Sequence, residues 1–312
     1  RRKPVLQCIF SYRKFMSQFG VSLTYTEMVS DMGLIYGNEE TKTYINFPNS
    51  SVPTGVQLFG NDPKNLAIAA KIVQNSNKFV DFFDVNMACP VPKVTKAGSG
   101  SSLLKDPKKC GDIIRAIKEV TDLPVSAKIR LGFDKNSINF LEVISELEKA
   151  GVSFIALHAR TAKDLYAGTP NFEIVKNLRQ KMKVPLIISG NIFTVEDALK
   201  AKEITGADYV MLARGGVGNP TLIKRINQAF NNEQIDLPPS FNEQKEYCLE
   251  LLRDLIEEKG EEKAVRIFRS MGPSFFSGIP EVKQLKNALA SSITTYQSVV
   301  DIIESYEKTH IF

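Results

Sequence analysis

The sequence predicts a (β/α)8 TIM barrel followed by a small all-helical C-terminal domain. Short apolar runs rich in β-branched residues alternate with longer segments of helical period, which is the pattern of βα units around a parallel sheet. This alternation occupies roughly 235 of the 312 residues, the usual size of such a barrel. An open doubly wound sheet is the less favoured alternative, because no G-x-G-x-x-G sequence follows the first run.

Eight apolar runs predict the strands of the barrel, and the first of them is the weakest. The strands are expected at Pro4 to Gln7, Leu23 to Glu27, Gly55 to Phe59, Phe82 to Asn86, Val125 to Ile129, Phe154 to His158, Leu186 to Ser189 and Tyr209 to Leu212. Amphipathic stretches between them predict helices at Asn65 to Val73, Cys110 to Val120, Phe140 to Ala150, Phe172 to Gln180 and Val195 to Ile204.

The strand-like runs end at the turn formed by Pro238 and Pro239. The rest of the chain predicts helices at Asn242 to Lys259, Glu261 to Ser270, Glu281 to Ala290 and Thr295 to Glu307. We therefore divide the chain into a barrel domain, residues 1–235, and a helical domain, residues 236–312.

The composition is that of an ordinary globular protein, with 43% hydrophobic and 24% charged residues. No window approaches the ~20 apolar residues needed to cross a bilayer, so we expect a cytoplasmic protein without a membrane partner. Four cysteines without C-x-x-C spacing and two histidines indicate neither a disulfide framework nor a metal site. The net charge is +5, and it is the sum of +9 on residues 1–235 and −4 on residues 236–312. A basic barrel attracts polyanions such as nucleic acid, although a chance imbalance explains the charge equally well.

Polar residues stand at the carboxyl ends of six successive predicted strands, where barrels of this type build their sites. They are Gln57, Asn86 with Cys89 just beyond, Lys128 with Arg130, His158 with Arg160, Ser189-Gly190-Asn191, and Ala213-Arg214-Gly215-Gly216. The last two loops are rich in glycine, and their exposed backbone N–H groups suit a phosphate, with Arg214 adding charge. Glycines that only form tight turns are the alternative.

Cys89 lies between Asn86 and Pro90 on a loop over the predicted barrel mouth, where a thiol can donate or accept a proton. Cys8, Cys110 and Cys248 lie in apolar or helical contexts and are expected to be packing residues. From the residues alone, the chain is a barrel enzyme for a phosphorylated ligand with a candidate acid at Cys89. The substrate stays open at this point.

Several segments together resemble the tRNA-dihydrouridine synthase family, whose bacterial type is the most similar. The segments are Thr24 to Ser30, Val56 to Gly60, Asp84 to Leu104, Lys128 to Gly132, His158 to Thr161, Val210 to Pro220 and Ala264 to Leu289. They occur in the family's order and spacing from about Phe19 onward.

The resemblance implies an FMN enzyme that uses NADPH and reduces the C5–C6 double bond of uridine in tRNA. Cys89 matches the family's general acid, which protonates C5. The positions matching the flavin-binding residues are Gln57, Lys128, His158, Ser189, Gly190, Asn191, Ala213, Arg214 and Gly215, and those lining the uracil side are Asn86, Arg130 and Arg160. The resemblance also implies tRNA as partner, bound across the barrel and the helical domain; we expect a monomer without metal.

The N-terminus departs from the family pattern. The family opens with a Pro-Met-Ala-Gly-type strand end that touches the flavin, whereas this chain has Lys3 to Ile9 there. Ala88, Ser189, Asn191 and Ala213 also replace the usual Gly, Asn, Asp and Gly. Two rival functions therefore remain: a small-molecule flavin oxidoreductase of the same barrel class, and a non-catalytic RNA-binding relative.

Overall fold

The computed structural model describes residues 9–309, and these form two compact units. The sheet unit comprises residues 22–192 and 196–212, and the helical unit comprises the described parts of residues 1–21, 193–195 and 213–312. This grouping differs from the predicted division at residue 235, because residues 9–21 and 213–235 group with the C-terminal helices.

The sheet unit contains a parallel sheet of seven strands in the order of the sequence. The strands are β1 (Thr24–Ser30), β2 (Thr54–Phe59), β3 (Phe82–Asn86), β4 (Val125–Arg130), β5 (Ile155–His158), β6 (Leu186–Ser189) and β7 (Tyr209–Met211). Seven of the eight predicted runs are thus strands, and the eighth, Pro4 to Gln7, lies outside the described residues. Each strand pairs with its neighbour in the sequence, as in a TIM barrel.

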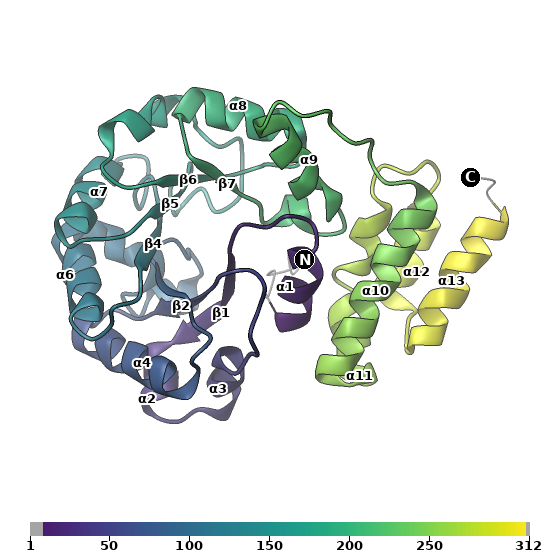
Figure 1. Ribbon diagram of the computed structural model, residues 1–312, viewed down its shortest axis with the longest axis horizontal. Coiled ribbons are helices and arrows are strands. Elements are labelled where there is room, and N and C mark those ends of the chain that lie inside the picture. Colours follow the sequence, from purple (N-terminus) through teal and green to yellow (C-terminus); the bar gives the residue numbers. More distant parts are fainter. Residues whose placement is uncertain (1–8, 310–312) are drawn as a thin grey trace. The chain divides into compact units, whose positions relative to one another are not determined.

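Helices cover the outside of the curled sheet, as Figure 1 shows for α4, α6, α7 and α8. The helices of the sheet unit are α2 (Asp31–Ile35), α3 (Glu39–Ile45), α4 (Pro63–Ser76), α5 (Pro92–Thr95), η1 (Gly100–Lys105), α6 (Pro107–Lys118), α7 (Phe140–Lys149) and α8 (Val195–Thr205). The starts of α4 and α6 follow from local chemistry, since Asp62 and Asp106 each accept a backbone N–H and a proline follows each of them.

The prediction of one helix at Phe172 to Gln180 is wrong. Two short 3-10 helices occupy that segment, η2 (Glu173–Val175) and η3 (Leu178–Lys181). Asn177 lies between them in the left-handed conformation with φ 54°, which a continuous right-handed helix does not allow.

The interior of the sheet unit changes from apolar to polar along β3. Phe82 packs edge-on against Tyr25 and Phe154, each with ring centroids 5.4 Å apart. Alternate residues of a strand point to the same side, so Asp84 and Asn86 follow Phe82 on the same face. All three side chains are buried. The apolar layer therefore lies at the amino ends of the strands, and the polar groups lie toward the carboxyl ends.

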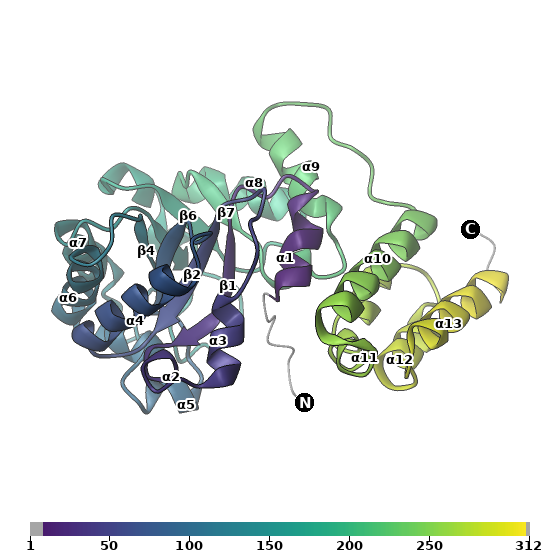
Figure 2. The ribbon, with the colours of Figure 1, turned by 60° about the horizontal axis from the view of Figure 1, so that its bottom comes forward.

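The helical unit is built from α1 (Phe10–Ser17), η4 (Arg214–Gly216), α9 (Thr221–Phe230), α10 (Phe241–Lys259), α11 (Glu261–Phe268), η5 (Gly272–Phe276), α12 (Lys283–Ser291) and α13 (Tyr296–Thr309). Helices α10 to α13 lie beside one another in both Figures 1 and 2. The helices predicted after residue 236 are thus present, with bounds close to those expected.

The N-terminal helix α1 packs against α10. Phe15 and Phe19 join the apolar core formed by the C-terminal helices, and the ring of Phe19 lies 5.2 Å from that of Tyr247. At the edge of this contact Lys14 pairs with Asp254 at 2.7 Å. The apolar face of α1 explains why residues 9–21 group with the C-terminal helices and not with the sheet, as the predicted barrel of residues 1–235 implied.

Candidate active site

The structure brings most of the predicted site residues together at the carboxyl ends of β2 to β6. In the strand register Gln57 is opposite Asp84, Asn86 opposite Lys128, and His158 opposite both Arg130 and Ser189. Adjacent parallel strands lie about 4.8 Å apart, so these residues form one continuous polar end of the sheet.

A chain of buried hydrogen bonds crosses this end of the sheet. The Asp84 carboxylate accepts from the Ser126 hydroxyl at 2.6 Å and from the Gln57 amide nitrogen at 2.7 Å. The Gln57 carbonyl accepts from the Asn86 amide nitrogen at 2.9 Å. The Asn86 carbonyl in turn accepts the backbone N–H groups of Ala88 at 3.1 Å and Cys89 at 2.8 Å. We call Asp84, Gln57 and Asn86 the amide relay, and it connects β2 and β3 to the loop that carries Cys89.

Asp84 is the member of the relay that the sequence did not single out. It is fully buried, and burial raises the pKa of its carboxyl to about 6 although the hydrogen bonds from Ser126 and Gln57 favour the ionised form. In the sequence, Asp84 stands out only as a charged residue inside the apolar run Phe82 to Asn86. That position does not reveal that Ser126 and Gln57 are its hydrogen-bond partners.

Cys89 lies half-buried on the loop after β3. Burial raises the pKa of its thiol, with Arg130 and Lys128 opposing the shift. The thiol is therefore protonated at neutral pH and can donate a proton. Its backbone carbonyl accepts from the N–H of Ser101 at 3.0 Å. Gly100 makes this approach possible, because it has φ 59° and a Cβ there would lie 2.7 Å from the Cys89 oxygen.

The other described cysteines have no such setting. Cys110 and Cys248 are fully buried, and burial raises the pKa of both thiols. The Cys110 thiol donates to the carbonyl of Leu103 at 3.2 Å. They pack as small apolar residues, as predicted, whereas Cys8 lies outside the described residues.

Lys128 is a half-buried cation at the end of β4. Burial, followed by the nearby Arg130 charge, lowers the pKa of its ammonium to about 8, while Asp84 and Cys89 act in the opposite direction. Its ammonium has no hydrogen-bond partner within residues 9–309. A cation held in this way is available to an anionic ligand.

Arg130 and Arg160 are both buried and bind main-chain carbonyls. Arg130 donates to the carbonyls of Ala88 at 2.8 Å, Thr161 at 2.8 Å and Leu165 at 2.9 Å. It therefore joins the Cys89 loop to the loop after β5. The uracil contact expected of both arginines stays a prediction, since these bonds engage much of the Arg130 guanidinium.

Arg160 fixes the rest of the loop after β5. It donates to the carbonyls of Ala167 at 3.1 Å and Gly168 at 2.5 Å, and its guanidinium lies 3.1 Å from Nε2 of His158. Tyr166 on this loop is 45% exposed, and the Arg130 guanidinium lies 5.6 Å from its ring centroid. Tyr166 is an addition to the residues chosen from the sequence, which held no signal for it.

The two glycine-rich loops belong to different units. Ser189, Gly190 and Asn191 end β6, and Gly190 has φ 133° with its Cα close to Pro170 and His158, where a Cβ would lie 2.9 and 3.2 Å from their side chains. Ala213, Arg214 and Gly215 belong to the helical unit, where the Arg214 guanidinium lies 5.5 Å from the Phe193 ring centroid. Phosphate binding by either loop stays a prediction.

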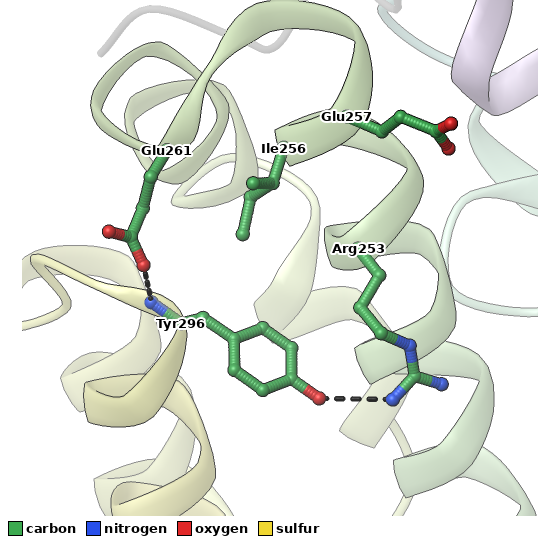
Figure 3. Close-up of a pocket in the computed structure, with 5 residues that line it drawn as sticks. All are labelled: Arg253, Ile256, Glu257, Glu261 and Tyr296. Atoms are coloured by element: carbon green, nitrogen blue, oxygen red, sulfur yellow. Dashed lines mark hydrogen bonds between the residues drawn. The ribbon is translucent and has the colours of Figure 1, made fainter.

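A pocket of about 500 Å³ lies in the helical unit, lined by Arg253, Ile256, Glu257, Glu261 and Tyr296. Arg253 donates to the Tyr296 hydroxyl at 3.0 Å, and Glu261 accepts the Tyr296 backbone N–H at 2.8 Å. Both hydrogen bonds are drawn in Figure 3. These groups satisfy one another and tie α10 and α11 to the start of α13. The residues that line this pocket therefore stabilise the packing of the helices, and none of them is a predicted site residue.

In the described part of the chain, no group of three or more His, Cys, Asp or Glu side chains is arranged to hold a metal ion. None of the helices in this part combines the length and apolarity that crossing a membrane requires.

Comparison with known proteins gives one family over nearly the whole chain. The family model described as dihydrouridine synthase (Dus) matches residues 7–308. The chain is 31% identical to tRNA-dihydrouridine synthase B of Pasteurella multocida, covering 89% of this chain and 84% of that protein. It is 30% identical to a probable tRNA-dihydrouridine synthase of Aquifex aeolicus, covering 97% and 94%. Among solved structures, histamine dehydrogenase from Rhizobium sp. 4-9 is 12% identical with a TM-score of 0.48, covering 78% of this chain and 45% of that one.

Proposed function

The chain belongs to the dihydrouridine synthase family and is an oxidoreductase, and from this premise we propose that it reduces uridine to 5,6-dihydrouridine in tRNA, using FMN and NADPH. One observation carries the proposal: three donors at the strand ends have spare N–H groups. The Lys128 ammonium has no hydrogen-bond partner within the described residues, and the Gln57 and Asn86 amides each use one of two N–H groups. Such donors fit ligands rich in acceptor atoms, as the flavin ring and uracil are.

The residues present fit a flavin of the kind that the family requires. We assign ring binding to Gln57, Lys128 and His158, and phosphate binding to the loops at Ser189 to Asn191 and Ala213 to Gly215. When bound, reduced FMN supplies a hydride to C6 of the uracil. The ammonium of Lys128 favours negative charge on the ring by its proximity in a partly desolvated site.

Cys89 supplies the proton that balances the hydride, delivering it to C5. Its raised pKa keeps the thiol protonated, and its loop is held by Asn86, Ser101 and Arg130. The uridine has to leave its stack to reach this thiol, as other bases do in enzymes that modify them. We assign contact with the uracil to Asn86, Arg130 and Arg160.

We also propose that tRNA binds to residues 1–235, which carry a net charge of +9, and to the helical tail, residues 236–312. Some tail cations have structural partners: Arg266 pairs with Glu262 at 2.7 Å, and Arg269 donates to the carbonyl of Ile293 at 2.6 Å. Lys283, at the start of α12, is exposed and remains the better candidate for an RNA phosphate.

The decisive experiment follows flavin reoxidation under anaerobic conditions. The protein is loaded with FMN, reduced by NADPH and mixed with an unmodified tRNA transcript. We expect reoxidation that depends on tRNA, together with a gain of two hydrogens per modified uridine by mass spectrometry. Equal reoxidation by free uridine would favour the small-molecule alternative. Failure to bind FMN would favour a non-catalytic relative, and would direct attention to the Lys3 to Ile9 segment.

A further inference from the structure

The amide relay has a fixed direction. The ionised Asp84 carboxylate has only acceptors, so Gln57 must turn its NH2 group toward it. The Gln57 carbonyl then faces Asn86, which must donate a hydrogen bond to it from its own NH2 group, at 2.9 Å. At the other end, the backbone N–H groups of Ala88 and Cys89 can only donate, and they meet the Asn86 carbonyl. Both ends therefore impose the same orientation on the two amides.

The direction decides what Asn86 can offer a ligand. Its carbonyl oxygen already accepts two backbone hydrogen bonds, which uses both lone pairs. Its amide nitrogen donates one N–H to Gln57 and keeps the other without a partner among residues 9–309. Asn86 can therefore act toward a ligand as a donor and not as an acceptor.

We propose that Asp84 is a positioning residue that sets the direction of the Gln57 and Asn86 amides, so that Asn86 holds the Cys89 loop and meets a carbonyl oxygen of the substrate base with its remaining N–H. Asp84 acts here through Gln57 alone, because its own bonds go to Ser126 and Gln57. The substrate part of this inference rests on the proposed function. The positioning part rests on the hydrogen bonds and can be tested without substrate.

A cycle of substitutions tests the direction of the relay. Asp84→Asn is expected to be tolerated, since the new amide can turn its carbonyl to Gln57 and its NH2 to Ser126, whose hydroxyl also lies 3.3 Å from the carbonyl of Phe83. Asn86→Asp places an acceptor against the Gln57 carbonyl, and Gln57 cannot turn while Asp84 requires its NH2 group. We expect this single change to lower the Tm by roughly 5 °C, the scale of a buried polar group left unpaired.

In the double variant Asp84→Asn/Asn86→Asp, the Gln57 amide can turn around and form both of its hydrogen bonds in the opposite direction. The new amide at position 84 would donate to the Gln57 carbonyl, and Gln57 would donate to the new carboxylate at position 86. That carboxylate would still accept from the backbone of Ala88 and Cys89. Asn86→Asp should therefore lower the Tm in the original background and not in the Asp84→Asn background. Alkylation of Cys89 by iodoacetamide should follow the same pattern, with a changed rate in the single variant and a restored rate in the double one.

Relief of charge repulsion between two carboxylates would also produce a rescue, and Gln57→Leu distinguishes the two causes. Without the Gln57 amide, repulsion persists but the relay does not, so Asp84→Asn should no longer rescue Asn86→Asp. Asp81→Asn is a control on the same segment, because Asp81 stands just before β3 and its carboxylate accepts the backbone N–H of Thr54 at 2.8 Å and, within residues 9–309, contacts no member of the amide relay. Rescue by Asp81→Asn, or rescue that persists in the Gln57→Leu background, would overturn the proposal.

The substrate part has its own readout. In the double variant residue 86 offers an acceptor in place of a donor, so tRNA reduction should stay at least about tenfold slower although Tm and Cys89 reactivity recover. Full recovery of tRNA reduction would overturn the donor assignment. If the unchanged protein does not reduce tRNA, the proposed function fails, while the Tm cycle still decides whether the relay operates.

Discussion

The sheet unit buries charged and amide side chains at its centre, whereas the helical unit buries mostly apolar ones. Asp84, Asn86, Arg130 and Arg160 are all at most 5% exposed. In the described part of the helical unit the buried polar side chains are Ser11 and Arg13, beside a core of phenylalanines, leucines and valines. Buried polar groups cost stability unless each is paired, whereas apolar burial supplies it. The contrast shows that the sheet unit holds most of the buried polar residues of the candidate site and that the helical unit is stabilised mainly by packing.

The contrast also changes how the helical unit can be tested. Deleting residues 236–312 would remove α10 to α13 and expose Phe15 and Phe19, which pack into the same core. Loss of activity after that deletion would therefore not separate RNA binding from folding. Single substitutions in the sheet unit or in the helical unit separate the two effects better.

The largest effect is expected at Cys89. Cys89→Ala should slow flavin reoxidation by tRNA by roughly 10² to 10⁴, the usual contribution of a positioned acid, and leave flavin reduction by NADPH nearly unchanged. Stopped-flow absorbance measures both steps. Cys110→Ala is the control, because that thiol is buried away from the loop. Equal loss of both steps would make Cys89 a structural residue.

Phe268 tests the apolar side of the comparison. Phe268→Ala should lower the free energy of unfolding of the helical unit by about 3 to 5 kcal/mol, because the side chain is fully buried in its core. Urea unfolding measures the change, with exposed Lys263 on the same helix as the control site. The rate per folded molecule should change little. A loss below about 1 kcal/mol would contradict the packing role.

The ionisation of Asp84 shows how much stability is lost when a carboxylate is buried in the sheet unit. Its pKa is about 6 in the folded protein and 3.8 without burial, so the folded state binds more protons between these values. The free energy of unfolding should therefore fall by about 3 kcal/mol as pH rises from about 4 to about 6. Denaturant titrations of the original protein and of Asp84→Asn at both pH values measure it. The fall should be absent in the variant; an identical fall would assign it to other groups.

The lowered pKa of Lys128 predicts that activity falls at alkaline pH. Its lowered pKa of about 8 means that the ammonium loses its charge above that pH. If the charge assists flavin reduction, the rate should fall about tenfold per pH unit above about 8. Lys128→Arg keeps the charge and should move the limit to higher pH, even where the rate itself is lower. A limit that stays in place in Lys128→Arg would exclude this group as its cause.

The smallest effect is expected at the surface of the helical unit. The Lys14 ammonium pairs with Asp254 at 2.7 Å, but the lysine side chain is 52% exposed. Lys14→Met should therefore change the free energy of unfolding by at most about 1 kcal/mol, and the difference should shrink at high salt. A salt-independent loss of several kcal/mol would show that α1 depends on this ion pair and not on its apolar face.

Local patterns in the sequence located the seven strands of the described sheet and the helices after residue 236, but not α1 or α9. Short apolar runs mark the strands, and the Asp-Pro pairs at 62–63 and 106–107 mark helix starts. Left-handed Asn177 shows the limit of such patterns, since an amphipathic stretch did not reveal that one residue would interrupt it. The strand-end residues could be chosen because all parallel strands in a βα barrel end at the same edge.

The sequence by itself determined the strands, the tail helices, the family and the position of Cys89, because periodicity, capping and motif spacing are properties of neighbouring residues. Only the tertiary structure decided that Asp84 orients Gln57 and Asn86, that Arg130 binds the carbonyl of Ala88, and that α1 joins the core of the tail. These contacts join residues far apart in the chain, or, as with Asp84 and Asn86, act through a third residue on another strand. Strand register and helix packing determine which of them meet, and a hydrogen bond has a direction that no residue type specifies alone.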